Sequence, residues 1–159
     1  MKHRDGLYLA LQEAQKALEG GDVPVGAVVV LGDEVVGTGF NVREAEQDPL
    51  GHAELVAIRA AAKTLGRWRL TGCTLYVNLE PCPMCAPAIV QARLDRLVFG
   101  AYDPKLGAAG TVFELIHRPE YNHDVEVIGG IREDECRALL QRFFRARREE
   151  SSQTPRTVI

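Results

Sequence analysis

The chain has few cysteines, few aromatic residues and no long apolar run. Aromatic side chains make up 6% of its 159 residues, and of the four cysteines only Cys82 and Cys85 form a C-x-x-C pair. This composition does not suit a disulfide framework and favours a metal site in a reducing compartment. The amino terminus is charged, and no apolar run reaches the roughly 20 residues of a membrane helix. We therefore expect a cytoplasmic protein with neither a signal peptide nor a membrane span.

An excess of positive charge is also missing. The net charge is −3 at pH 7, so the overall charge gives no reason to expect nucleic-acid binding, and only local clusters of basic residues could do so. The length and a hydrophobic content of 46% fit one domain with a sizeable core. We predict a single domain over residues 1–149, followed by a flexible tail over residues 150–159.

Apolar periodicity alternates between helical and extended segments along the chain. Helices are predicted at residues 5–19, 52–65, 83–94, 112–117 and 132–149, and strands at residues 25–31, 34–40, 73–79, 96–101 and 125–128. Pro83 and Pro87 predict a distortion or a later start of the third helix, because proline lacks a backbone donor. The alternation predicts an α/β fold, a three-layer α/β/α sandwich around a mixed five-stranded sheet.

The residues that could perform chemistry lie between His52 and Cys85. His52 and the pair Cys82 and Cys85 offer one imidazole and two thiolates to a single metal ion, and Glu54 follows His52 closely. A structural zinc site normally has four protein ligands, whereas a catalytic site has three and leaves one position for water. Helix N-termini, where we expect all these residues, favour the thiolate form of cysteine. The pattern predicts an enzyme in which Glu54 is a base.

The last predicted helix carries an apolar stripe and a basic cluster. We expect its inward face to consist of Cys136, Leu139, Leu140, Phe143 and Phe144. The two phenylalanines could pack in the core or in a dimer, or could stack on bases. The basic cluster consists of Arg142, Arg145, Arg147 and Arg148. It could be a solvated helix end or a contact for RNA phosphates.

His52-Ala-Glu54 with Pro81-Cys82-x-x-Cys85 matches the signature of zinc-dependent nucleoside and nucleobase deaminases. Further matching segments are Val23-Pro-Val25-Gly-Ala, Gly39-Phe-Asn41, Leu79-Glu-Pro-Cys82, Val98-Phe-Gly-Ala, Gly107-Ala-Ala-Gly110, Asn122-His123 and Phe143-Phe-Arg145. With these, residues 5–149 resemble the bacterial tRNA-specific adenosine deaminases of the cytidine and deoxycytidylate deaminase superfamily.

The resemblance implies a cytidine deaminase-like fold, one Zn²⁺ per subunit, a homodimer, and hydrolytic deamination of the wobble adenosine in a tRNA anticodon stem-loop to inosine. Bound zinc lowers the pKa of water toward ~7, and Glu54 would transfer the protons. By the same resemblance, the base pocket would be lined by Asn41, Val25, Ala53 and Pro81. RNA would be contacted by Asp103, Lys105 and Arg145.

Four positions depart from the pattern of this family. Tyr102 and Arg118 stand where an arginine and a histidine are typical, and Pro83 and Pro87 replace a β-branched residue and a glycine. These departures concern the RNA contact surface and the pocket wall. They leave open a deaminase of a free base or mononucleotide, acting on guanine, cytosine or deoxycytidylate. A non-enzymatic, zinc-stabilised RNA-binding module is a further alternative.

Overall fold

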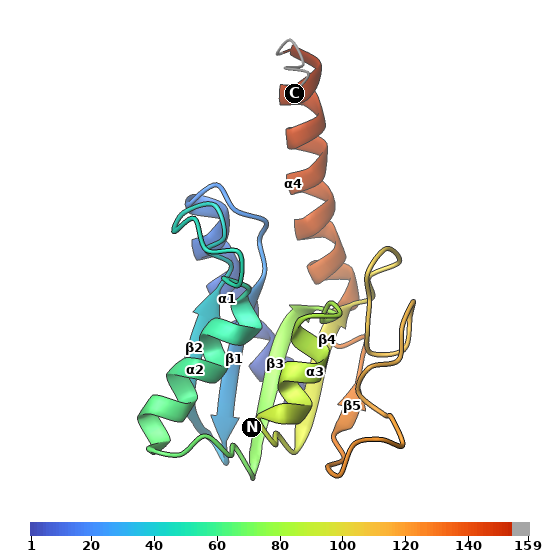
Figure 1. Cartoon of the computed structure of the whole chain (residues 1–159). Coiled ribbons are helices and arrows are strands. Elements are labelled where there is room, and N and C mark those ends of the chain that lie inside the picture. The colour runs from blue at the N-terminus through green and yellow to red at the C-terminus, as the bar shows by residue number, and fades with distance from the viewer. Residues whose placement is uncertain (154–159) are drawn as a thin grey trace.

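A mixed sheet lies between two layers of helices in the computed structural model, which describes residues 1–153 (Figure 1). The strands are β1 (Gly26–Leu31), β2 (Glu34–Phe40), β3 (Cys73–Leu79), β4 (Arg96–Ala101) and β5 (Glu126–Ile128). The sheet has the order β2-β1-β3-β4-β5, with β1 antiparallel to both neighbours and β3, β4 and β5 parallel. The predicted three-layer sandwich around a mixed five-stranded sheet is confirmed.

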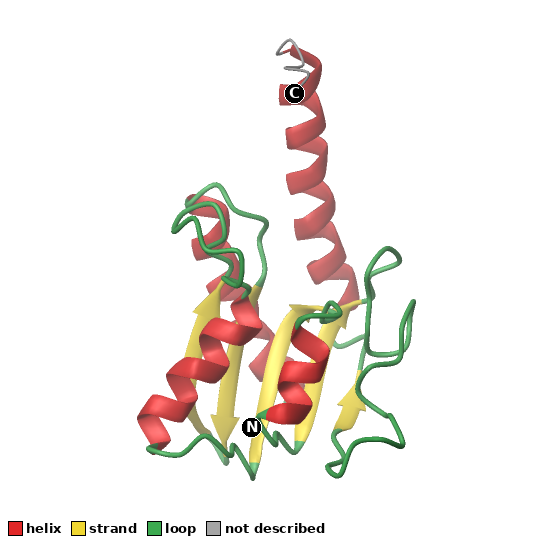
Figure 2. Ribbon diagram, in the orientation of Figure 1, coloured by secondary structure: helices red, strands yellow, loops and turns green. Residues whose placement is uncertain are grey.

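The helices are α1 (His3–Glu19), α2 (Ala53–Leu65), α3 (Cys85–Gln91) and α4 (Glu133–Gln153). Helices α2 and α3 cover the front face of the sheet in Figure 2, and α1 and the start of α4 lie behind it. On that rear face, Gly6 of α1 lies against the ring of Tyr76, and Cys136 of α4 lies against Gly100. None of the helices in the described part of the chain is long and apolar enough to span a membrane.

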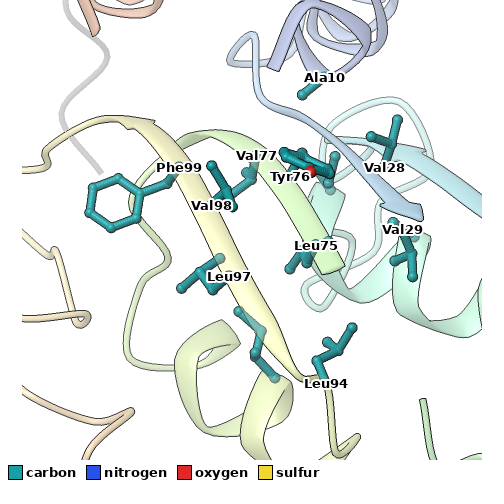
Figure 3. Close-up of a cluster of buried hydrophobic side chains, with 14 of the residues drawn as sticks. Ala10, Val28, Val29, Leu75, Tyr76, Val77, Leu94, Leu97, Val98 and Phe99 are labelled. Atoms are coloured by element: carbon teal, nitrogen blue, oxygen red, sulfur yellow. The ribbon is translucent and has the colours of Figure 1, made fainter. Parts of the chain in front are cut away.

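The core is formed mainly by side chains of the three central strands (Figure 3). Val29, Leu75, Val77 and Leu97 are fully buried, and Phe99 is 1% exposed. Because helices cover both faces of β1, this strand reads as a continuous apolar run, whereas β3 is an alternating segment rich in β-forming residues. Both patterns mark a strand clearly in the sequence.

Two glycines on β2 allow α2 to approach the sheet closely. A Cβ atom at Gly37 would lie 2.6 Å from the backbone nitrogen of Ala61, and one at Gly39 would lie 2.6 Å from that of Ala57. Helix α2 presents small residues at this contact, since Ala53, Ala57 and Ala61 are all buried. The close packing fixes the first turn of α2 beside the end of β2.

The predicted helix at residues 112–117 is wrong. This segment forms turns and one isolated β-bridge between Ala109 and Glu114. The carboxylate of Glu114 accepts hydrogen bonds from the backbone N–H groups of Ile116 and His117. Such local bonds give the backbone an alternative to helical hydrogen bonding.

The third helix starts later and ends earlier than the predicted range of residues 83–94. Helix α3 begins at Cys85 and ends at Gln91, and the late start agrees with the expectation from Pro83 and Pro87. Pro87 is the third helical residue, where a backbone N–H would have no acceptor inside the helix in any case. Arg93 has a φ of 61°, which takes the chain out of the helical conformation.

Helix α4 is longer than predicted and projects beyond the sheet (Figure 1). It continues to Gln153 instead of ending at residue 149, and residues 154–159 of the predicted tail lie outside the described residues. Cys136, Leu139 and Leu140 are buried as predicted, but Phe144 is 46% exposed, so its predicted inward position is wrong. Phe144 instead lines a groove between α4 and the loop that follows β4. The other predicted elements agree with the structure within two residues.

We expect Gly37→Ala to lower the free energy of unfolding by about 1–3 kcal/mol, because the added methyl group would force α2 away from β2. Gly20→Ala is the matched control. Its Cβ would lie 3.5 Å from the nearest atom, so a change within about 0.5 kcal/mol is expected. Urea unfolding of the three proteins measures both values, and equal midpoints for Gly37→Ala and Gly20→Ala would contradict the packing argument.

Candidate metal and catalytic site

His52, Cys82 and Cys85 are brought together by the fold, with their ligand atoms within 4.8 Å of one another. His52 Nδ1 lies 3.3 Å from Cys85 Sγ and 3.5 Å from Cys82 Sγ. In a tetrahedral zinc site with ordinary bond lengths, a nitrogen and a sulfur ligand lie about 3.5 Å apart. The spacing therefore fits a zinc ion, and these residues could hold a metal with a fourth position left for water.

The ends of two helices supply the three ligands. His52 is the N-cap residue of α2, and Cys85 is the first residue of α3. Cys82 lies in the preceding turn, where its carbonyl oxygen accepts hydrogen bonds from the N–H groups of Cys85 at 3.1 Å and Ala86 at 2.9 Å. This turn points both sulfur atoms of the C-x-x-C pair toward the start of α2.

The ligand cluster already favours a thiolate. The pKa of Cys82 is lowered to about 3, chiefly by a hydrogen bond from the thiol of Cys85 and also by His52 and the backbone N–H groups of Cys85 and Met84, against the effect of burial. The pKa of Cys85 is correspondingly raised by its bond to Cys82 and by burial. The pKa of His52 is raised by its hydrogen bond to Cys82. These contacts therefore favour the thiolate form of Cys82, which is the form of cysteine that binds metals.

Glu54 lies in the first turn of α2 and is 4% exposed. Burial raises the pKa of its carboxyl group to about 7. A group with such a pKa can both accept and donate a proton at neutral pH, which suits general acid–base catalysis. Glu54 is not a member of the ligand cluster. Its position next to His52 leaves it available for the predicted role of base.

Two of the four residues predicted to line a base pocket are chain neighbours of the metal-binding residues. Ala53 is buried between His52 and Glu54, and Pro81 is buried immediately before Cys82. The loop after β2 is tied to the start of α2 by a hydrogen bond of 2.9 Å from the N–H of Val42 to the carbonyl of Gly51. These contacts place the loop after β2 beside the ligands.

Asn41 and Val25 are linked to each other in that region. The N–H of Asn41 donates to the carbonyl of Val25 at 3.0 Å, and both residues are 8% exposed. The Asn41 amide donates to the carbonyl of Val23 at 3.3 Å and accepts from the N–H of Arg43 at 3.1 Å. Asn41 therefore has a local structural role, and its contact with a base stays a prediction.

Asp103, Lys105 and Arg145, the predicted RNA contacts, line one groove of about 890 Å³ between α4 and the loop after β4. The carboxylate of Asp103 accepts hydrogen bonds from the N–H groups of Lys105 at 2.9 Å and Leu106 at 3.3 Å. Asp103 thus shapes the loop that presents Lys105. The structure brings the three residues to one surface, and their contact with RNA stays a prediction.

The unusual residues Tyr102 and Arg118 have contacts outside the ligand cluster. Tyr102 is 48% exposed and packs edge-on against Phe99, with 5.1 Å between ring centroids. Arg118 forms an exposed ion pair with Glu120 at 2.8 Å. Both departures from the family pattern are accommodated by these local contacts.

Sequence reasoning missed Glu80, a carboxylate that is 2% exposed and lies two residues before Cys82. It accepts four hydrogen bonds from the loop that follows β4. Its position in the sequence could have indicated a structural role, because an acidic residue between a buried strand and a metal-binding turn needs hydrogen-bond donors. Its partners could not be named from the sequence.

Known proteins with a similar chain decide the family. The model of the MafB19-like deaminase family matches residues 1–148. A tRNA-specific adenosine deaminase of Bacillus subtilis is 49% identical over 148 residues, which cover 92% of each chain. The chain belongs to the tRNA-specific adenosine deaminase family.

Two solved structures show which deaminases this chain resembles more in fold and sequence. One, from studies of A-to-I editing by tRNA:A34 deaminases at the wobble position of transfer RNA, has a TM-score of 0.82 and 43% identity, covering 86% of this chain and 99% of that one. A guanine deaminase from Bacillus subtilis has a TM-score of 0.62 and 34% identity, covering 79% of this chain and 83% of that one. In both fold and sequence, the deaminase is therefore more similar to the first of these structures than to the guanine deaminase.

We expect Cys82→Ala to weaken zinc binding by at least about 100-fold, since loss of even an outer partner of a metal ligand costs about 10–100-fold. Cys73→Ala is the matched control, because Cys73 is a buried free cysteine at the start of β3. It should keep the zinc affinity of the wild-type protein. Competition with a zinc-binding dye measures the affinities, and equal values for the two variants would rule out Cys82 as a ligand.

Proposed function

We propose that this deaminase converts the wobble adenosine of a tRNA anticodon loop to inosine by hydrolysis, as a cytoplasmic homodimer with one zinc ion per subunit. The observation that carries the proposal is the buried Glu54 beside a cluster that has three metal-binding residues in the described part of the chain, within 4.8 Å of one another. A closed structural zinc site would have four protein ligands. The names of the similar tRNA-specific adenosine deaminases support the choice of substrate.

The roles of the chain's residues follow from their positions. His52, Cys82 and Cys85 would hold the zinc ion, which, when bound, lowers the pKa of water from 15.7 toward ~7. Glu54 accepts the proton of the attacking water as its oxygen adds to C6 of adenine. Glu54 delivers this proton to the ring nitrogen N1. It then takes the proton of the new C6 hydroxyl group and passes it to the departing amine, so that ammonia leaves and hypoxanthine remains on the ribose.

Burial of Glu54 is what allows one carboxylate to perform both transfers. A solvated carboxyl group with its ordinary pKa of 4.5 would donate a proton poorly at neutral pH, whereas a pKa of about 7 supports acceptance and donation. The burial of Glu54 in the first turn of α2 therefore contributes directly to the proposed chemistry, because it removes the carboxyl group from water.

The groove beside α4 favours a polynucleotide over a free base. A base in an anticodon loop must be turned out of its strand to reach a pocket, and the flanking phosphates then need positive partners. The groove of about 890 Å³ is lined by arginines on α4, namely Arg137, Arg145, Arg147 and Arg148. Free guanine and cytosine carry no phosphate, so they would not need these positive partners.

We expect Glu54→Gln to lower the rate of inosine formation in an anticodon stem-loop by about 10²–10⁴-fold, because proton transfer by the carboxylate is lost. Zinc content and stem-loop affinity should stay unchanged, since Glu54 is not in the ligand cluster. Glu126→Gln is the control, because the carboxylate of Glu126 lies in an exposed ion pair with Arg96. Mass spectrometry of digested RNA measures inosine, and a filter assay measures binding.

The same preparation is tested with free adenine, guanine, cytosine and deoxycytidylate, with released ammonia as the readout. Turnover of one of these with an inert stem-loop would replace the proposed substrate by a small molecule. A Glu54→Gln variant as active as Glu126→Gln would remove Glu54 from the mechanism.

A further inference from the structure

Glu80 connects the metal-binding turn with a distant loop. It follows the last residue of β3 and precedes Pro81 and Cys82, and its side chain is 2% exposed. A buried carboxylate is costly unless several donors satisfy it. The donors therefore indicate what Glu80 holds in place.

All four side-chain hydrogen bonds of Glu80 come from the loop of residues 103–111. Oε1 accepts from the N–H of Asp103 at 3.1 Å and from the hydroxyl of Thr111 at 2.5 Å. Oε2 accepts from the N–H groups of Ala109 at 3.0 Å and Thr111 at 3.2 Å. The carboxylate thus binds both ends of the loop and no other part of the chain through the bonds observed among the described residues.

The backbone around Glu80 strengthens this attachment. The N–H of Glu80 donates to the carbonyl of Ala101 at 2.9 Å, and the N–H of Ala108 donates to the carbonyl of Pro81 at 2.8 Å. The loop also packs closely on the carboxylate, since a Cβ at Gly107 would lie 2.6 Å from the carboxyl carbon of Glu80 and 2.6 Å from the carbonyl oxygen of Asp103. The loop therefore has one well-defined position relative to the turn that carries Cys82.

We propose that Glu80 is a positioning residue for the RNA substrate, because it fixes the loop of residues 103–111 next to the metal-binding turn. Residues of this loop, including Asp103 and Lys105, form one wall of the groove of about 890 Å³ beside α4. The bond from Asp103 to Glu80 orients the residue whose carboxylate in turn holds the N–H of Lys105. This inference rests on the proposed function, since it concerns how the same site receives RNA.

The decisive variant is Glu80→Gln, which has nearly the same shape. A glutamine has one acceptor oxygen, so it can keep the N–H groups of Ala109 and Thr111 and donate to the hydroxyl of Thr111. Its NH₂ group then faces the N–H of Asp103, and that bond is lost. We expect about tenfold faster hydrogen exchange at the Asp103 amide, because a hydrogen bond to a charged acceptor is removed.

The kinetic consequence should appear in substrate binding. If the loop occupies its productive position only about one tenth of the time, KM for the stem-loop rises about tenfold. The value of kcat should change less than about threefold, and the zinc content should be unchanged, because Glu54 and the ligands keep their places. A residue that merely supported the fold would change the melting temperature without this selective rise in KM.

Glu114→Gln is the matched control, because Glu114 also accepts backbone N–H groups but belongs to the segment after the loop. Its KM should equal that of the wild-type protein. Gly107→Ala tests the same contact from the other side and leaves Glu80 intact, so it decides the question if Glu80→Gln does not fold. It too should raise KM with zinc retained.

Two results would overturn the inference. One is a KM for Glu80→Gln, or for Gly107→Ala if the former is unfolded, that matches Glu114→Gln. The other is unchanged hydrogen exchange at Asp103. A wild-type protein that does not turn over the stem-loop is a failure of the proposed function instead, and hydrogen exchange then still decides whether Glu80 holds the loop.

Discussion

Three metal-binding atoms can meet in this chain only because two helices begin at the same edge of one sheet. Strand β2 leads through a loop to α2, and β3 leads directly to the turn before α3. The small residues where β2 and α2 meet let these elements approach closely, which places His52 beside Cys82 and Cys85. Every other feature of the site, including the burial of Glu54, depends on this convergence.

Buried polar side chains fix the loops around that edge. Asp22, Asn78 and Glu80 are each at most 2% exposed. The carboxylate of Asp22 accepts hydrogen bonds from backbone N–H groups of the loop after β2. The side chain of Asn78 accepts a hydrogen bond from the N–H of Gly26, the first residue of β1, and donates one to the carbonyl of Pro24, just before β1. Leaving one of these buried polar groups without a partner would cost about 1–3 kcal/mol, so the bonds stabilise the observed positions of the loops.

Burial and hydrogen bonding shift the pKa values of neighbouring groups of the site in opposite directions. Burial raises the pKa of Glu54 to about 7, whereas hydrogen bonds lower that of Cys82 to about 3. One small region therefore contains a carboxyl group able to exchange protons and a thiolate able to bind a metal. Groups whose environments separate their pKa values in this way are typical of acid–base catalysis.

The sequence by itself determined the elements and the chemistry-bearing residues, because both depend on short-range patterns. An apolar run marks β1 and an alternation of β-forming residues marks β3, and the spacing from His52 to Cys85 predicts three metal-binding residues and a base. Most of the fold and the composition of the ligand cluster could thus be predicted.

Only the tertiary structure decided which distant segments meet. Residues 112–117 avoid a helix because Glu114 bonds to nearby N–H groups. Phe144 is 46% exposed and lines the groove beside α4 instead of packing in the core. Glu80 reaches Thr111 across 31 residues of chain, and no local pattern encodes that contact. Burial of a carboxylate selects its partners among all donors that the fold brings near, so its role appears only after the chain has folded.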